Sequence, residues 1–364
     1  MGKPGGNSSR VAGLATGLQK YGFEVELVIP KPTSKNYPTN LDNIKMHQLP
    51  ITANNSTINQ IERAILLTYK AKKIKKKTKA ILQFEHSLLG GFASLMGCRD
   101  FVLEARDIAD PKWDLTYKHL SKVVYNLEKY AVKKAIKVIV VSNSFKEFIK
   151  QEWNVPEEKI EVIPPGYFKS KIERLKTIEE TKGLISYLGG LFSSLNVDKL
   201  IALAKSLENK DTMLYIIGDG PLRRLFEQRV RDNGLNNVIF TGSLPIEEAY
   251  KLIAKSQITL LPFHRSLTTA FLEPIKVMDY AALGKAMVLD NVSDFIDFLG
   301  ENDAALVSDP SNQDEFIRNV HTLLEDEQLR KRIGANAKRL LKDYSWENQA
   351  KKLARMYEEL DYEK

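Results

Sequence analysis

EPIKVMDYAALGK at 273–285 lies between two apolar runs, QITLLPF at 257–263 and AMVL at 286–289. The apolar runs are typical of buried strands. Pro274 suits the first turn of a helix, and Gly284 suits the position that ends one. The order strand, loop, helix, strand is the repeating unit of a parallel sheet, so this stretch predicts an α/β fold.

The same helix carries a cation and a carboxylate, Lys276 and Asp279, on its opening turns. The unpaired N–H groups and the dipole at a helix N-terminus favour a phosphate. Lys276 would add positive charge to such a site, and Asp279 offers acceptors for two hydroxyl groups of a sugar ring. A crossover helix with a solvated Lys–Asp pair gives the same spacing, so the stretch alone leaves both interpretations open.

Length and composition limit the number of domains and the classes of protein to which the chain can belong. The chain has 364 residues, 43% of them hydrophobic, which suits two domains. No run approaches the ~18–20 consecutive apolar residues of a membrane-spanning helix, and no secretory signal opens the sequence. The single cysteine, Cys98, excludes an intramolecular disulfide and a cysteine-based zinc site. We therefore expect a cytoplasmic protein without a metal site.

The net charge is +8, and much of it comes from one cluster. The lysines of this cluster are Lys70, Lys72, Lys73, Lys75, Lys76, Lys77 and Lys79. They extend a stretch with apolar residues at helical spacing from Ile58 to Tyr69. No aromatic residues interleave with the lysines, which argues against a nucleic-acid groove. A solvated helix face and docking on an anionic membrane surface both fit the cluster.

The amino-terminal stretch predicts an incomplete sheet. A glycine-rich loop with Gly5 and Gly6 opens a helix over 10–21, and a strand follows over 24–29. Such a loop normally leaves the first, central strand of a doubly wound sheet, and no strand precedes it here. Either the sheet closes differently or the sequence is truncated upstream, and we favour truncation.

Strands and helices then alternate through both halves of the chain, which predicts two parallel-sheet domains. We expect an amino-terminal domain over 1–166, a charged linker over 167–182, a carboxyl-terminal domain over 183–343, and a last helical segment over 344–364 that crosses back to the first domain. Ligands bind such sheets at the carboxyl ends of the strands.

Eight motifs occur in one order along almost the whole chain. They are the Gly5-Gly6 loop whose helix ends in YGFEV, LEARD at 103–107, VIPPG at 162–166, YLGG at 187–190, GDGP at 218–221, TGSLP at 241–245, EPIKVMDYAALGKAMV at 273–288 and YSWEN at 344–348. In this order and spacing they resemble the family 4 glycosyltransferases, which are retaining enzymes of the GT-B fold. The resemblance implies two doubly wound, Rossmann-like domains that face a central cleft, here without the first amino-terminal strand.

The resemblance also implies a site for a nucleotide-diphosphate sugar, in which no further cofactor takes part. The residues it implies for the donor are Gly5, Gly6, Gly189, Gly190, Gly218, Gly220, Pro221, Gly242, Ser243, Arg265, Glu273, Pro274, Ile275 and Asp279. The residues it implies near the reacting groups are Lys276, Asp107, Arg106 and His86. A lone histidine after a strand also fits a purely structural role.

Two further departures from the family pattern concern the donor site. The family commonly places an arginine and a lysine where this chain has Gly190 and Leu195. Its paired glutamates map to Phe271 and Asp279, and Glu273 stands in for the first of them. Losing two cations removes charge-assisted bonds of ~1.5–3 kcal/mol each. Lys276, with Arg265, is expected to compensate.

The resemblance implies transfer of a hexose to an acceptor hydroxyl with retention at the anomeric carbon. A glycan or a lipid-linked glycan is the expected acceptor, the latter if the lysine cluster docks on the inner face of a membrane. Two alternatives remain: a nucleotide-sugar epimerase of the same fold, because fold does not fix function, and a non-catalytic homologue that binds nucleotide-sugars.

Overall fold

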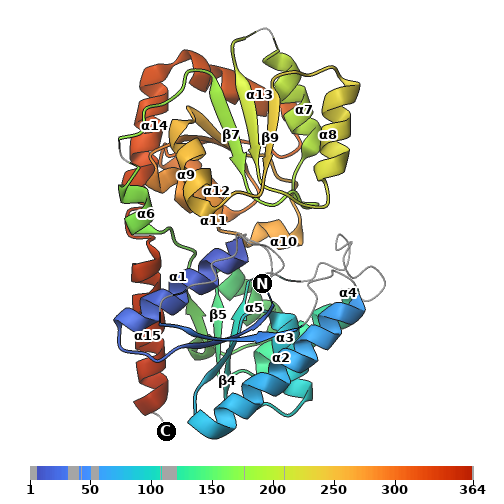
Figure 1. Ribbon diagram of the computed structural model, residues 1–364, viewed down its shortest axis with the longest axis vertical. Helices are drawn as coiled ribbons and strands as arrows, with labels where there is room; N and C mark the ends of the chain where they lie inside the picture. Colours follow the sequence, from blue (N-terminus) through green and yellow to red (C-terminus); the bar gives the residue numbers. More distant parts are fainter. Residues whose placement is uncertain are drawn as a thin grey trace. The chain divides into compact units, whose positions relative to one another are not determined.

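The computed structural model describes residues 6–31, 41, 43–50, 57–106, 108, 121–175, 177–208 and 210–362. The chain forms two compact units (Figure 1). Unit 1 comprises Met1–Pro164 and Glu347–Lys364, and unit 2 comprises Pro165–Trp346.

Unit 1 is built around parallel strands. Its elements are α1 (Gly6–Lys20), β1 (Glu26–Pro30), β2 (Lys45–Leu49), α2 (Thr57–Thr78), β3 (Leu82–Phe84), α3 (Ser87–Leu95), β4 (Phe101–Ala105), α4 (Ser121–Lys134), β5 (Lys137–Val140), α5 (Asn143–Trp153), a 3-10 turn (Glu157–Lys159), β6 (Ile160–Val162) and nearly all of α15 (Trp346–Tyr362). Strand β4 is buried along its whole length, as its apolar sequence predicts.

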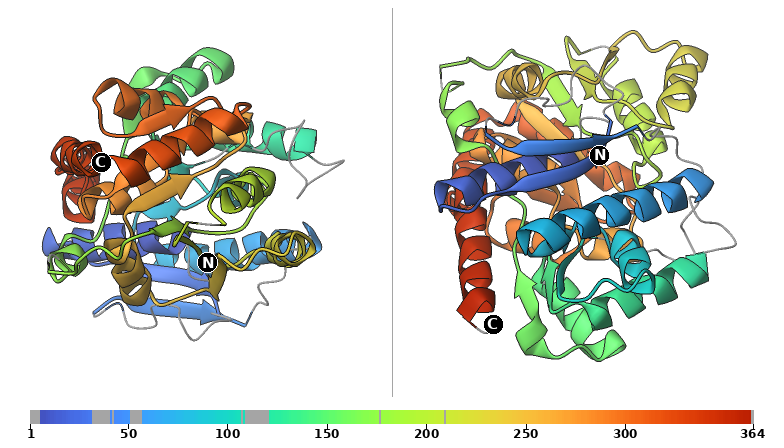
Figure 2. Two further views of the ribbon diagram at one scale, coloured as in Figure 1. Left: turned by 90° about the horizontal axis from the view of Figure 1, so that it is seen from above. Right: turned by 60° about the horizontal axis from the view of Figure 1, so that its bottom comes forward.

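The strands of unit 1 fall into two groups. A four-stranded sheet has the order β3-β4-β5-β6, and β1 pairs with β2 in a separate two-stranded sheet. Both are parallel throughout. The blue ribbons of β1 and β2 run side by side in Figure 2. Among the described residues no strand lies between β1 and β3.

Unit 2 contains a single six-stranded sheet. Its elements are α6 (Lys169–Glu173), β7 (Leu184–Leu188), α7 (Val197–Ser206), β8 (Met213–Ile217), α8 (Arg223–Asp232), β9 (Val238–Gly242), α9 (Ile246–Lys255), β10 (Ile258–Leu261), α10 (Leu267–Ala270), α11 (Ile275–Ala282), β11 (Ala286–Asp290), α12 (Asp294–Glu301), β12 (Leu306–Ser308), α13 (Gln313–Glu325) and α14 (Glu327–Leu340). Helices cover both faces of the sheet (Figures 1 and 2).

The strand order of unit 2 is β12-β11-β10-β7-β8-β9, and every pair is parallel. The chain runs outward from β7 to β9 and then returns to place β10 on the other side of β7. The direction of winding therefore reverses between β7 and β10. Open α/β sheets bind ligands outside the carboxyl ends of strands at such a reversal.

Most predicted elements are present, and α11 ends where the sequence predicts. Pro274 is the residue before the helix, and Gly284 follows its last turn at a φ of +68°. Strands β2 and β12 and helix α12 were not predicted, and helix α10 lies between β10 and α11. The segment expected as a linker carries α6 and belongs to unit 2.

Candidate functional site

The carboxyl ends of β7, β8 and β10 carry the loops that the resemblance implies for the donor. Gly189 and Gly190 follow β7, and the segment Gly218–Pro221 follows β8. The loop between β10 and α11 contains Arg265 and Glu273. These loops meet at the reversal of winding, so topology alone places the sequence-predicted donor residues of unit 2 around one edge of the sheet.

Lys276, in the first turn of α11, has an aromatic environment. Its Nζ lies 4.3 Å from the ring centroid of Tyr187 and 4.5 Å from that of Phe263. The same Nζ donates a hydrogen bond of 2.9 Å to Tyr187 Oη, which donates to the carbonyl oxygen of Gly190 at 2.9 Å. Among the described residues Lys276 forms no ion pair. Its ammonium group is held by two aromatic rings and a hydroxyl group.

Burial lowers the pKa of Lys276 to about 7. Removing water from around an ammonium group disfavours its charged form, and no carboxylate among the described residues offsets this cost. An anion bound at Nζ would favour the charged form and raise the pKa again. A buried ammonium group in these surroundings is suited to bind an anion such as a phosphate.

Two glycines make the close approach of these loops feasible. A Cβ on Gly189 would lie 2.6 Å from Lys276 Nζ, and one on Gly218 would lie 2.0 Å from the carbonyl oxygen of Gly189. Gly218 also has a φ of +144°, which side chains rarely tolerate. Backbone hydrogen bonds join the loop after β7 to the end of β8 and the loop that follows it. Gly189 N donates to Ile217 O at 2.9 Å, and Leu191 N donates to Asp219 O at 3.1 Å.

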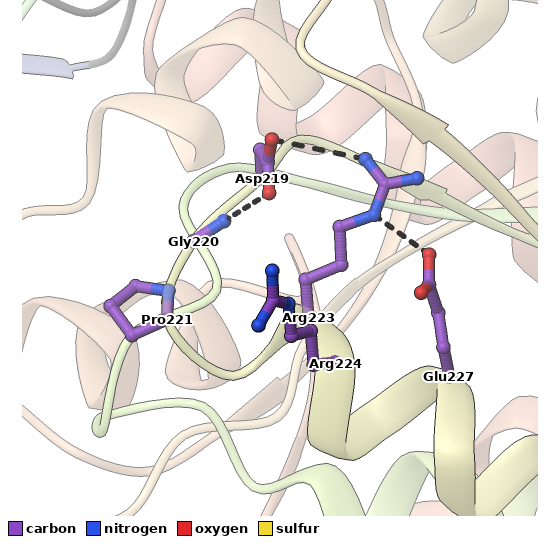
Figure 3. Close-up of a pocket in the computed structure, with 6 residues that line it drawn as sticks. All are labelled: Asp219, Gly220, Pro221, Arg223, Arg224 and Glu227. Carbon is purple, nitrogen blue, oxygen red and sulfur yellow. Dashed lines mark hydrogen bonds and ion pairs between the residues drawn. The ribbon is translucent and has the colours of Figure 1, made fainter.

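A pocket of about 620 Å³ lies beside the segment after β8 (Figure 3). It is lined by Asp219, Gly220, Pro221, Arg223, Arg224 and Glu227. Arg223 Nε donates to Glu227 Oε1 at 2.7 Å, and its Nη1 lies 3.8 Å from Asp219 Oδ2. Gly220 and Pro221, which the resemblance implies for the donor, thus line the pocket together with two arginines.

Asp279 does not lie on the surface of this site. Its side chain is buried, and its Oδ1 accepts a hydrogen bond of 2.6 Å from Tyr250 Oη. Burial raises the pKa of Asp279 to about 8, opposed by the hydrogen bond from Tyr250. In this arrangement Asp279 connects α11 to α9. The structure does not place it with the donor residues around Lys276.

Among the remaining sequence-predicted residues of unit 2, Gly242 pairs with Gly218 through an isolated β-bridge. Gly242 ends β9 and is buried, whereas Ser243 beyond it is exposed. Arg265 is exposed and contributes, after the hydrogen bonds from Ser311, to lowering the pKa of Asp309. Pro274 and Ile275 form the amino-terminal boundary of α11 beside Lys276. Glu273 precedes them and raises the pKa of Tyr344 in addition to the effect of burial.

Gly190 and Leu195 stand where the resemblance implies two cations. Leu195 is buried, and it pairs with Phe263 through an isolated β-bridge. Sequence reasoning missed Tyr187, Phe263, Arg223 and Arg224. Arg223 and Arg224 were detectable, because they directly follow GDGPL at 218–222. Tyr187 and Phe263 were not, because only the fold brings them to Lys276.

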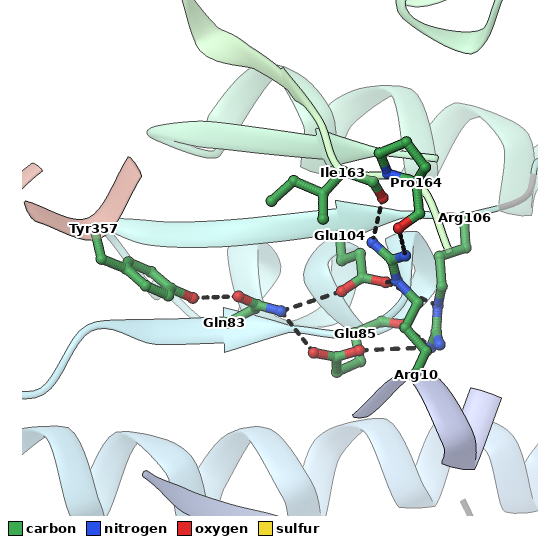
Figure 4. Close-up of polar contacts among 8 residues, drawn as sticks. All are labelled: Arg10, Gln83, Glu85, Glu104, Arg106, Ile163, Pro164 and Tyr357. Carbon is green, nitrogen blue, oxygen red and sulfur yellow. Dashed lines mark hydrogen bonds and ion pairs between the residues drawn. The ribbon is translucent and has the colours of Figure 1, made fainter. Parts of the chain in front are cut away.

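Unit 1 holds a buried polar network at the carboxyl ends of β3 and β4 (Figure 4). Arg10 of α1 forms an ion pair with Glu104 and donates to the carbonyl oxygens of Ile163 at 2.8 Å and Pro164 at 3.1 Å. Burial raises the pKa of Glu104, but the charges of Arg10 and Arg106 outweigh this effect and lower it. The network attaches the start of α1 to the sheet.

Arg106, Gln83 and Glu85 extend this network. Arg106 donates to the carbonyl oxygen of Glu85 and lies 3.5 Å from Glu104 Oε1. The side-chain amide of Gln83 donates through Nε2 to Glu85 Oε1 at 2.6 Å. Its Oε1 accepts a hydrogen bond from Tyr357 of α15. Burial and the charge of Glu104 raise the pKa of Glu85 to about 7, opposed by Arg106.

His86 lies next to this network but has a structural contact. It is the residue that caps α3, and its Nδ1 accepts a hydrogen bond of 3.2 Å from Leu88 N. Gly6 is the first residue of α1. Gly5 and Asp107, which the sequence also proposes for the site, lie outside the described residues.

No group of three metal-ligating side chains occurs in the part of the chain that the structure describes. Within the same residues, no helix has the length and apolar composition needed to cross a membrane.

Comparisons with known proteins decide the family. The family described as glycosyltransferase family 4 matches residues 4–167, and the family described as glycosyl transferases group 1 matches residues 168–340. The chain belongs to the family 4, group 1 glycosyltransferases. The boundary between the two matches lies within three residues of the boundary between the units, after Pro164.

Relatives of this family 4 chain are distant. An uncharacterised glycosyltransferase of Methanocaldococcus jannaschii is 26% identical over 258 residues, a match that spans 66% of this chain and 64% of the relative. The chain thus spans less than two thirds of the length of that relative.

Solved structures of low sequence identity show the fold. Sucrose-phosphate synthase from Thermosynechococcus elongatus has a TM-score of 0.79 at 15% identity, covering 96% of this chain and 92% of that one. HepE of Anabaena, solved in complex with UDP-glucose, has a TM-score of 0.74 at 19% identity, covering 99% and 97%. With its two parallel α/β units, the family 4 chain has the GT-B fold.

Proposed function

We propose that this protein transfers a hexose from a nucleotide-diphosphate sugar to an acceptor hydroxyl, with retention at the anomeric carbon. The observation that carries the proposal is the position of Lys276 at the reversal of winding in a family 4 sheet, where it has no ion-pair partner in the part of the chain that the structure describes. HepE, a structure of the same fold, binds UDP-glucose. We therefore take a UDP-hexose as the first donor to test.

In the proposed reaction the bond between the anomeric carbon and the diphosphate oxygen breaks while the acceptor oxygen bonds to the same carbon. The acceptor proton passes to the leaving diphosphate oxygen on the same face of the sugar, so the configuration is retained. Lys276 Nζ stabilises the charge that develops on the diphosphate. The N–H groups at the start of α11 support it through the helix dipole.

The protein groups in this proposal supply the positive charge that a metal ion supplies elsewhere, and we propose a reaction without metal or cofactor. Lys276, the amino-terminal end of α11 and the glycine loops after β7 and β8 bind the diphosphate. Excess EDTA is then expected to leave turnover unchanged. A loss that Mg²⁺ restores would contradict this part of the proposal.

Thermal stabilisation tests the donor site directly. The full chain is heated with UDP, GDP, ADP, CMP and their common sugar conjugates. A ligand at 100 times its dissociation constant adds ~2.7 kcal/mol, which is a readily measured shift. The variant Lys276→Met, which removes the charge and keeps the chain length, should lose the shift. Absence of a shift with every nucleotide would refute the nucleotide-sugar site.

Product analysis then separates transfer from the alternatives. Transfer requires an acceptor and gives a product whose anomeric configuration, read from NMR coupling constants, matches that of the donor. Epimerised nucleotide-sugar without an acceptor would identify an epimerase. Binding without any conversion across an acceptor panel would identify a non-catalytic homologue.

We propose a lipid-linked glycan as the acceptor and the cytoplasmic face of a membrane as the place of reaction, on the evidence of α2. Its exposed face carries Ile65, Leu66 and Tyr69, and its last turns carry exposed lysines. Lys72 and Lys75 are fixed by the carbonyl oxygens of Met96 and Arg99 at 2.7 and 3.0 Å. Each lysine near an anionic surface contributes about 1 kcal/mol to binding.

Vesicle flotation tests the membrane proposal. The chain should float with vesicles of phosphatidylglycerol and phosphatidylcholine and not with phosphatidylcholine alone. Glutamate at the exposed Lys73, Lys76 and Lys77 should abolish flotation. Glutamate at three exposed lysines of unit 2 is the matched control: Lys205, Lys255 and Lys342. Equal flotation of both variants would contradict docking through α2.

A further inference from the structure

Unit 2 contains a buried ion pair between Lys199 and Asp290. Lys199, in the first turn of α7, donates from Nζ to Asp290 Oδ1 at 2.6 Å. Asp290 is the last residue of β11. The two side chains are 1% and 0% exposed. A buried ion pair often stabilises a protein no more than a well-packed apolar pair does, so stability alone does not explain its presence.

The Lys199–Asp290 pair lies at the carboxyl ends of the strands, the edge at which open α/β sheets bind ligands. Lys199 Nζ also donates to the carbonyl oxygen of Pro310, just after β12, at 3.0 Å. The same Nζ lies 5.1 Å from the ring centroid of Phe316. The pair therefore connects the start of α7 to the ends of β11 and β12.

Phe263, two residues after β10, is connected to the same carboxylate through its main chain. Burial raises the pKa of Asp290 to about 7, and the hydrogen bonds from Lys199 and from the main chain of Phe263 oppose this effect. Hydrogen bonds to a charged acceptor are stronger than those to a neutral one. Asp290 therefore fixes the main chain at Phe263.

A second connection joins the segment that carries Phe263 to the start of α7. Asn196 N donates to Pro262 O at 2.9 Å. The side chain of Asn196 caps α7, because its Oδ1 accepts from Lys199 N at 3.0 Å. The backbone at Lys199 and the backbone at Phe263 are thus held together by main-chain bonds as well as through Asp290.

The ring of Phe263 is also one of the two aromatic rings around Lys276. Its centroid lies 4.5 Å from Lys276 Nζ, and the residue is buried. An aromatic ring attracts an ammonium group through its π electrons. It also excludes water from the ammonium group, which lowers the pKa of Lys276. A shift of the main chain at Phe263 would move the ring and change both effects.

We propose that Lys199 and Asp290 are positioning residues for Lys276, which act through the main chain of Phe263 and hold its ring against the ammonium group. Asp290 forms its ion pair with Lys199 and not with Lys276 among the described residues. The inference rests on the proposed function, because only the proposed contact of Lys276 with a diphosphate gives the place of its ammonium group a role in transfer.

Two double variants of the full chain test the proposal. In the asparagine variant, Lys199→Met with Asp290→Asn, an oxygen that accepts from the main chain of Phe263 is kept. In the leucine variant, Lys199→Met with Asp290→Leu, that acceptor is lost. Neither variant leaves a buried charge without its partner. The control, Lys285→Met with Glu180→Leu, removes an ion pair of 2.8 Å that lies before β11 and β7, at the opposite edge of the sheet.

The measurement is the pH at which Lys276 reacts half-maximally with an amine-selective acylating reagent, read by peptide mass spectrometry. It needs no nucleotide, and circular dichroism shows that each variant is folded. The wild-type midpoint should lie at about 7. The leucine variant should raise it by about one pH unit or more, toward the ordinary value of about 10.4, because water reaches the ammonium group. The asparagine variant and the control should keep the wild-type midpoint.

An unchanged midpoint in the folded leucine variant would overturn the proposal. An equal rise in the leucine variant and in the asparagine variant or the control would also overturn it, because the bond to the main chain of Phe263 would then not be the cause. If the leucine variant does not fold, Asp290→Ala with Lys199→Met removes the same acceptor with a smaller side chain.

A third substitution tests whether the effect passes through Phe263. Phe263→Leu removes the ring, so its addition to the leucine variant should raise the midpoint no further. Full additivity of the two shifts would mean that the pair and the ring act separately, and would overturn the proposal. If the midpoints follow the expectation and no nucleotide-sugar binds, the proposed function fails while the positioning of Lys276 is supported.

Discussion

Donor affinity should depend steeply on pH because of Lys276. Burial lowers the pKa of Lys276 to about 7 in the unliganded protein, and a bound diphosphate should restore it to near its ordinary value of about 10.4. Affinity is then fully present below pH 7 and is lost as pH rises through that value. The dissociation constant should double at pH 7, increase about tenfold by pH 8 and about a hundredfold by pH 9.

Titration calorimetry with a nucleotide-sugar between pH 6 and pH 9 measures this effect. A nucleotide-sugar is preferred to UDP, because the terminal phosphate of UDP itself titrates near pH 6. Lys276→Arg is the matched control, since arginine keeps its charge over the whole range, and its affinity should be independent of pH. Tyr187→Phe removes the hydroxyl that accepts from Lys276 Nζ and should weaken binding by roughly fivefold.

The wild-type result decides whether the reasoning is right. A dissociation constant that stays flat from pH 7 to pH 9, in protein shown to be folded by circular dichroism, would mean that Lys276 keeps its charge without a ligand. Equal pH dependence in the wild type and in Lys276→Arg would assign the titration to another group.

Three further predictions concern stability. Gly218→Ala should lower the Tm of unit 2 by roughly 6 °C or more in calorimetry, because its Cβ would lie 2.0 Å from Gly189 O. The control Gly234→Ala, whose Cβ meets nothing within 4 Å, should lower the stability of unit 2 by only about 1 kcal/mol. Similar losses of Tm for the two variants would contradict the argument. Arg10→Met should lower the free energy of unfolding of unit 1, measured by urea denaturation, by about 3–5 kcal/mol, because it leaves Glu104 buried without its partner. The control Lys20→Met, which removes the exposed ion pair with Glu347, should lower it by less than about 1 kcal/mol. Glu85 has a folded-state pKa of about 7, above its ordinary value, so its contribution to stability is present at low pH and is lost as pH rises to 7. The variant Glu85→Gln should therefore have the wild-type Tm at pH 4.5 and a higher Tm than the wild type at pH 8. Equal Tm values of variant and wild type at both pH values would refute the raised pKa.

The sequence predicted α11 well because its signals are local. Pro274 and Gly284 mark both ends of the helix, and apolar runs on either side mark the strands. Alternation of such units was enough for two parallel-sheet domains. Strand β2 was missed because KMHQL at 45–49 lacks the apolar run of a buried strand, and the structure exposes part of it.

The site was predicted less completely, because its decisive contacts join residues far apart in the chain. Tyr187 and Lys276 are separated by 89 positions, and no local pattern pairs them. The burial of Asp279 against Tyr250 is likewise a property of how α9 packs against α11. The motif located the loops, whereas side-chain direction depended on tertiary packing.

The composition of unit 1 from two separate segments has a consequence for biosynthesis. Residues Glu347–Lys364 belong to unit 1, and Tyr357 of α15 bonds Gln83 beside β4. A ribosome adds about 5–20 residues per second, so Pro165–Trp346 takes about 10–35 s to synthesise between the two parts of unit 1. During that interval the amino-terminal segment of unit 1 lacks helix α15. Unit 2 is therefore the first part of the nascent chain that can reach its final structure. The segment Met1–Pro164 is the part that we expect chaperones to bind during synthesis.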